Sequence, residues 1–141
     1  MKTDVALLLI LTAVLWGTTP VLEKIGLGKT DPITGLTIRS IAITLALLVY
    51  LAVAGRVKEI FRADAKTIII FSTTGLLAGL LGMVTYFYAL KKGATSQIVP
   101  IAAAYPLVSA LLSVIILREN VTPVRVLGTV LIVAGIWFVR G

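Results

Sequence analysis

The sequence predicts an all-α membrane protein, a bundle of five transmembrane helices. Hydrophobic residues make up 59% of the 141-residue chain, charged residues 13%, and the mean hydropathy is +1.09, which is too apolar for a water-soluble domain of this size. Charged residues divide the chain into five apolar stretches, each close to the roughly 20 residues that a helix needs to cross a bilayer. We expect a single transmembrane domain over residues 1–141, with spans near 4–22, 33–54, 66–90, 95–117 and 122–139.

The charges and the missing residue types argue against several functions. The formal net charge is +7, but the Lys and Arg residues are spread over the loops instead of forming one patch, so we expect no nucleic-acid partner. The chain has no Cys and no His, which removes disulfides and the usual transition-metal ligands. Its carboxylates fall in loops or at span ends. We therefore expect no enzyme, no metal and no cofactor.

The first span carries a polar and aromatic face. Spacings of four, three and four place Thr12, Trp16, Thr19 and Glu23 on one side of a helix. Pro20 cannot donate to the carbonyl of Trp16, so we expect the helix to open beside this face. We interpret the span as lining a cavity; the alternative is a Trp in the interfacial belt above a tolerated proline kink.

The second span contains an intramembrane charge. Asp31 and Pro32 read as an N-cap followed by a proline at the first helical position, so a helix begins there. Arg39 lies about two turns further on, on a face with Gly35 and two alanines. A charge within a span is a functional-site candidate. Alternatively, the side chain snorkels to the interface and only anchors the helix.

The segment after the second span, residues 55–65, predicts a solvated loop or a short interfacial helix with Ile60 and Phe61 among the headgroups. The third span then places three glycines and Tyr86 on one helical face, and we interpret the glycines as a site of close helix packing. The Tyr86 hydroxyl has three possible roles: contact with substrate, a bond to a neighbouring helix, or a place at the membrane interface.

The fourth span contains two prolines, Pro100 and Pro106, which remove hydrogen bonds to the carbonyls of Ser96 and Ala102. Discontinuous helices near the bilayer midplane are typical of transporter binding sites. Tyr105 and Ser109 continue a weakly polar face below the break.

The fifth span begins at Thr122 and Pro123 in the same way as the second. Gly128 and Gly135 are seven residues apart, about two turns, and so share one face that is a candidate packing surface. The alternative is that glycine is simply common in membrane helices.

Several motifs together resemble a known family. They are Pro106, the segment LVSALLSVIILREN ending beyond Glu119, GTVLIVAGI from Gly128, Trp16-Gly17 and the early Arg39. This pattern resembles the EamA-type half of the drug/metabolite transporter superfamily, which is related to the small multidrug exporters, and the resemblance covers nearly the whole chain. It implies one half of a ten-helix inverted-repeat transporter in the prokaryotic cytoplasmic membrane.

One feature of the related small exporters is missing. Their first span carries a glutamate that exchanges protons for cationic drugs, and Val14 occupies that position here. The proton–drug antiport mechanism therefore does not carry over. The first span keeps Asp4 and Glu23 only at its two ends, where we expect water to surround them.

Two functions remain open. The first is a secondary transporter protomer that moves a small metabolite or amphipathic solute by alternating access as a dimer; the alternative is a non-transporting subunit that assembles with another membrane protein. The partners would be the bilayer, a small-molecule substrate, and either a second, antiparallel copy or a sister half-transporter chain. The polar side chains favour the transporter. We predict substrate contacts at Trp16, Thr19, Arg39, Tyr86, Tyr105 and Ser109, helix breaks at Pro20, Pro100 and Pro106, and packing or dimer contacts at Gly75, Gly79, Gly82, Gly128 and Gly135.

Overall fold

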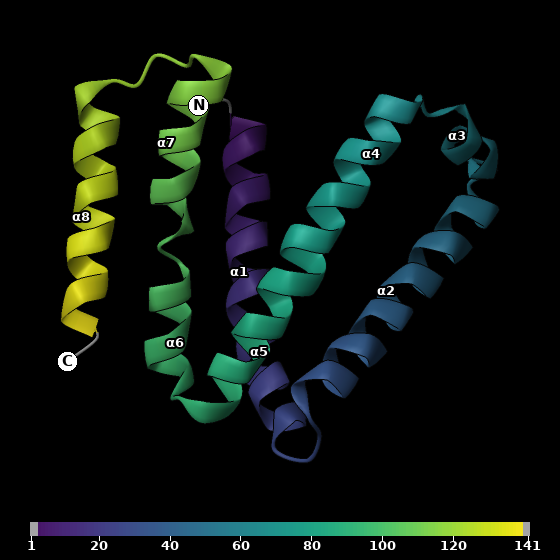
Figure 1. Cartoon of the computed structure of the whole chain (residues 1–141), viewed down its shortest axis with the longest axis horizontal. Coiled ribbons are helices and arrows are strands. Elements are labelled where there is room, and N and C mark those ends of the chain that lie inside the picture. Colours follow the sequence, from purple (N-terminus) through teal and green to yellow (C-terminus); the bar gives the residue numbers. More distant parts are fainter. Residues whose placement is uncertain (1–2, 140–141) are drawn as a thin grey trace. The chain divides into compact units, whose positions relative to one another are not determined.

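The computed structural model describes residues 3–139, which form helices and loops with no strand. The elements in order are α1 (Thr3–Leu27), α2 (Pro32–Val53), α3 (Val57–Arg62), α4 (Ala65–Thr74), η1 (Gly75–Gly82), α5 (Met83–Lys92), α6 (Thr95–Ala102), α7 (Tyr105–Leu117) and α8 (Pro123–Val139) (Figure 1). The chain divides into two compact units, the first ending at Lys91 and the second beginning at Lys92.

Four segments of the described chain are long and apolar enough to cross a membrane. They are α1, α2, the continuous segment Ala65–Lys92 and the segment Thr95–Leu117. The last helix, α8, has 17 residues and is also apolar, and about 17 residues is the lower end of the spanning range. The prediction of an all-α membrane protein with five membrane helices is confirmed.

A side-chain cap and a glycine cap set the two ends of α2. Asp31 Oδ1 accepts from the backbone N–H groups of Ile33 at 2.9 Å and Thr34 at 3.2 Å, so the predicted helix start is observed. At the other end Gly55 adopts a φ of 67°. The N–H of Gly55 then donates to the Ala52 carbonyl and the N–H of Arg56 to the Leu51 carbonyl, which closes the helix with a Schellman motif.

The first helix is longer than predicted, because α1 continues past residue 22 to Leu27. Glu23 and Lys24 are therefore helical, although the predicted span ended near residue 22. The Lys24 ammonium donates to the carbonyls of Leu90 at 2.6 Å and Lys91 at 3.1 Å. Cations are favoured at the C-terminus of a helix. The last carbonyls of α5 therefore compensate the positive charge of Lys24, which lies in the last turn of α1.

Three helices of the first unit, α1, α2 and α5, converge at one end (Figure 1). The buried apolar side chains of the described residues lie there: Leu27, Leu36, Phe87 and Leu90 are at most 3% exposed. Lys91 Nζ adds a hydrogen bond of 2.6 Å to the Thr30 carbonyl in the loop between α1 and α2. Most other large apolar side chains are exposed, as expected where lipid is the solvent.

The third span contains a π-helix, η1, between α4 and α5. Its i→i+5 hydrogen bonds put more residues in each turn than an α-helix has. A spacing of three residues therefore covers a smaller part of a turn, and Gly79 and Gly82 lie further apart around the axis than in an α-helix. Three of the eight residues of η1 are glycine, the residue that constrains backbone geometry least.

In the second unit, α6 and α7 follow each other and α8 returns beside them (Figure 1). The interruption between α6 and α7 lies at Ala103 and Ala104. Pro100 lies inside α6, and Pro106 lies in the first turn of α7.

Candidate functional site

The first unit contains a cavity of about 330 Å³ at the converging end of α1, α2 and α5. This volume suits a small molecule. The lining residues come from all three helices and from the loop after α1: Glu23, Gly26, Leu27, Thr30, Gly35, Ile38, Arg39 and Phe87.

The α1–α2 hairpin sets which lining residues face each other. In an antiparallel pair, residues at equal sequence distance from the turn lie at the same depth. Leu27 and Gly35 form one such level, where a Cβ on Gly35 would lie 3.5 Å from Leu27 Cδ2 and 3.7 Å from Phe87 Cε2. Glu23 and Arg39 form the next level, one helical turn deeper. Because Gly35 has no side chain, space stays open next to the Glu23–Arg39 level.

An ion pair lies at this second level. Arg39 Nε lies 3.5 Å from Glu23 Oε1, and the side chains are 38% and 10% exposed, respectively. Glu23 Oε1 is buried and accepts no hydrogen bond from the described residues. The expectation that water surrounds Glu23 is therefore wrong: α2 and its arginine shield the carboxylate. Packing against α2 produces this shielding, and position along α1 alone did not indicate it.

The rest of the lining is apolar apart from the Thr30 hydroxyl. One acidic and one basic group give the cavity a formal charge near zero, beside hydrocarbon from Leu27, Ile38 and Phe87. A small solute with both polar and apolar parts fits this surface chemically. Among residues 3–139, no three acidic side chains gather as a metal site requires.

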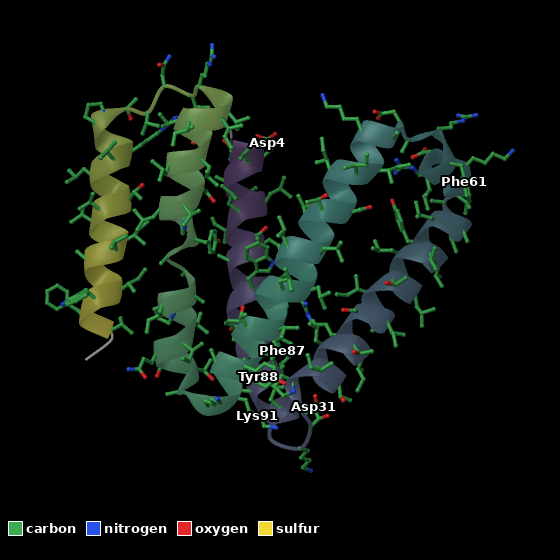
Figure 2. All side chains as sticks on the ribbon, in the orientation of Figure 1. Asp4, Asp31, Phe61, Phe87, Tyr88 and Lys91 are labelled. Carbon is green, nitrogen blue, oxygen red and sulfur yellow. The ribbon has the colours of Figure 1, made fainter. Side chains whose placement is uncertain are left out.

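The two lysine contacts fix the end of this unit. Lys24 binds the last carbonyls of α5 and Lys91 binds the Thr30 carbonyl, so α5 is tied to both α1 and the loop that follows it. Figure 2 shows Phe87, Tyr88, Lys91 and Asp31 close together at this end. Phe87 and Leu90 are buried at the same end, and Phe87 also lines the cavity.

The predicted substrate residues separate into four groups. Arg39 lines the cavity. Tyr86 is close by, because the centre of its ring lies 6.3 Å from that of Phe87, although it does not line the cavity. Trp16 is 66% exposed on α1 and Thr19 donates its hydroxyl to the Leu15 carbonyl. The remaining two, Tyr105 and Ser109, belong to α7 of the second unit, and their contact with substrate stays a prediction.

The structure also shows the surroundings of Pro20 and of the five glycines predicted to pack. Pro20 is buried within the continuous helix α1, and the helix breaks expected at the three prolines stay predictions. A Cβ placed on Gly75, Gly79, Gly128 or Gly135 would meet nothing within 4 Å, and one on Gly82 would meet the Leu77 carbonyl of its own helix at 3.3 Å. Contact of these glycines with another chain stays a prediction.

The polar face predicted for the first span includes Glu23, but the predicted substrate site does not pair it with Arg39 and contains neither Phe87 nor Thr30. A signal for the pair was present, because Glu23 and Arg39 are eight residues from Asp31 on either side and carry opposite charges. A tight hairpin centred near Asp31 brings such residues together. Phe87 follows about fifty residues later, and no local pattern connects it with the hairpin.

Together, these features define an integral, multi-pass membrane protein with an ion pair in the wall of a cavity between its helices. The chain belongs to the EamA-like transporter family, which matches residues 4–141. The resemblance to the EamA-type half of the drug/metabolite transporter superfamily is thereby confirmed.

A relative of similar length exists in an archaeon. An uncharacterized protein of Methanocaldococcus jannaschii is 30% identical over 134 residues, and the alignment covers 94% of each chain. No solved structure matches this chain.

Proposed function

We propose that this chain is one protomer of a secondary transporter that moves a small metabolite or amphipathic solute across the prokaryotic cytoplasmic membrane by alternating access as a dimer. The observation that carries the proposal is the Glu23–Arg39 pair in the wall of the cavity. Membership of a transporter family supports it. The proposal assigns no catalytic step to the chain.

The ion pair favours transport over a purely structural role. Charged side chains within a span are costly, at about 2.5–3.5 kcal/mol each on insertion scales, and they are retained mainly where they face a cavity or a partner. A subunit that only packs against another protein could bury apolar residues of the same volume instead, often with no loss of stability. Here both charges line the same space.

The dimer is proposed because five spans form half of an inverted-repeat transporter. A copy inserted in the opposite direction recreates the missing half. If the N-terminus lies on side one, that side carries seven of the loop Lys and Arg residues and the opposite side five, with Arg39 left out as intramembrane. Such a small bias is compatible with insertion in both directions. A sister chain of opposite orientation is the alternative partner.

The test begins with purified protein in lipid nanodiscs, whose thermal shift is measured with a set of amino acids, cations and sugars. Flux of the best ligand into proteoliposomes is then measured. Arg39→Gln and Glu23→Gln should each reduce flux by about tenfold or more, because losing an interaction worth about 1.4 kcal/mol of binding free energy weakens binding by a factor of ten. Lys29→Gln is the matched control, since this loop lysine does not line the cavity.

The double variant Glu23→Gln/Arg39→Gln separates function from folding. Each single change leaves one charge within a span without its partner and should lower stability, whereas the double change removes both charges and should restore it. Recovery of the thermal midpoint without recovery of flux supports a role in transport. If the double variant transports at the normal rate, the pair is structural and the site lies elsewhere. A scan in which no ligand binds or crosses favours the non-transporting subunit.

A further inference from the structure

A short helix outside the cavity, α3, has exposed apolar residues. It connects the end of α2 to the start of α4 and lies away from the end where Phe87 and Lys91 gather (Figure 2). Val57 is 42% exposed, Ile60 47% and Phe61 83%. Because these residues lie outside the spans, the hydrocarbon core that covers the long helices does not account for them.

The apolar residues of α3 share one side. At 100° per residue, Val57, Ile60 and Phe61 fall within about a third of the helix circumference. Lys58 and Arg62, four residues apart, lie together on the adjacent side. A helix with an apolar side next to a cationic one is typical of a helix lying in the plane of a bilayer interface.

The acidic groups of this segment are already paired. Arg56 binds Glu59 through Nε at 3.0 Å and Nη2 at 2.8 Å, and this contact holds the pKa of the Glu59 carboxyl below its ordinary value. Asp64 caps α4 by accepting from the backbone N–H and the hydroxyl of Thr67. Three cations, Lys58, Arg62 and Lys66, form no salt bridge with the described residues.

The connections on either side of α3 keep it near the bilayer surface. Three residues separate α2 from α3, and two separate α3 from α4. An extended residue covers at most about 3.6 Å, so α3 stays within roughly 11 Å of the spans that it joins. Headgroups of the adjacent leaflet lie in this zone.

We propose that α3 is a membrane-surface anchor for anionic phospholipids. Val57, Ile60 and Phe61 insert at the boundary between headgroups and acyl chains, while Lys58, Arg62 and Lys66 bind the phosphate groups of anionic lipids. The location between two spans favours lipid over a protein partner, and the unpaired positive charge matches a negatively charged leaflet. This role is independent of the cavity, because no residue of α3 lines it.

The chain has no native cysteine, so single spin labels can test the anchor directly. We would attach a label at Ile60→Cys on the apolar side and, as matched control, at Glu59→Cys on the polar side, in nanodiscs with and without phosphatidylglycerol. The label at position 60 should be accessible to oxygen and protected from a water-soluble nickel chelate, and the label at 59 should show the reverse. Anionic lipid should move the label at 60 deeper.

The triple variant Lys58→Gln/Arg62→Gln/Lys66→Gln, with the label at position 60, should lose the dependence on phosphatidylglycerol. The proposal is overturned if the label at 60 is as accessible to nickel as the label at 59. It is also overturned if the label is protected from both reagents, which indicates contact with protein such as a second copy. Equal depth in neutral and anionic discs would exclude the proposed anionic headgroups.

Discussion

At the level of single residues, the main feature of the protein is the pair formed by Glu23 and Arg39 across the α1–α2 hairpin. Each charge alone would be costly within a span, and together they compensate each other. The arrangement explains why Arg39 does not need to reach the bilayer surface, since its counterion is on the neighbouring helix.

Asp31 gives a prediction about pH at the same scale. Hydrogen bonds from Thr34, first from its side chain and then from its backbone, lower the pKa of the Asp31 carboxyl, with a further contribution from the backbone N–H of Ile33. A lowered pKa in the folded state means that ionised Asp31 stabilises the protein. That contribution is complete above the ordinary carboxyl pKa and is lost as pH falls through the lower, folded-state value.

Asp31→Ala should therefore reduce the thermal midpoint at pH 7 by a few degrees and have a smaller effect near pH 3. Asp31→Ser is the matched control, because serine keeps an N-cap acceptor without a charge. The midpoints of the wild type and both variants can be measured in detergent across this range. An Asp31→Ala difference that does not change with pH would show that the charge at Asp31 does not contribute.

At the level of elements, α8 presents two different sides. Thr129, Val133 and Ile136 are half-buried, which marks the side that packs against α6 and α7. Gly128 and Gly135 lie roughly a quarter to a third of a turn away from this side, exposed, with space around both. The helix therefore keeps a flat, open side after its contacts within the second unit are made.

We predict that this open side contacts a second copy. Gly135→Leu should shift the purified protein from dimer toward monomer, because a bulky side chain keeps the two backbones apart. Val130→Leu, on the other side of α8, should leave the dimer intact. Light scattering coupled to size exclusion measures both. An unchanged dimer for Gly135→Leu with an unchanged thermal midpoint would place the interface on another surface.

At the level of the whole molecule, the number of spans determines how two copies can combine. Five spans place the two ends of this chain on opposite sides of the membrane, so an antiparallel pair has the symmetry of an inverted repeat. The loop charges differ by only seven to five, and three of the seven, Lys58, Arg62 and Lys66, lie on α3 and in the first turn of α4. Those three are also the cations assigned to lipid.

Reporter fusions at Gly141 test the antiparallel pair. Activity of a cytoplasmic reporter and of a periplasmic reporter in separate fusions should both be measurable, because a weak bias permits both orientations. Adding two lysines to the loop between α1 and α2 should balance the charges and make the two signals more equal. A signal from one side alone would exclude the antiparallel homodimer and require a separate partner chain.

The sequence by itself determined the class of protein and where several helices begin. Composition and the spacing of charges are properties of the chain that need no packing, and they indicated five membrane helices. The starts of α2 and α8 were also predicted, because a cap such as Asp31 or Thr122 bonds to residues only two or three positions away. Arg39 was identified as a candidate because a charge within a span is unusual wherever it points.

Only the tertiary structure decided which residues meet. The pairing of Arg39 with Glu23 depends on the register of the hairpin. Phe87 lines the cavity because α5 returns to the end of α1. The longer α1 follows from contacts that Lys24 makes with α5, and η1 changes the helical period on which the glycine face was based. These features arise from contacts between distant parts of the chain, which local patterns of hydrophobicity and capping do not encode.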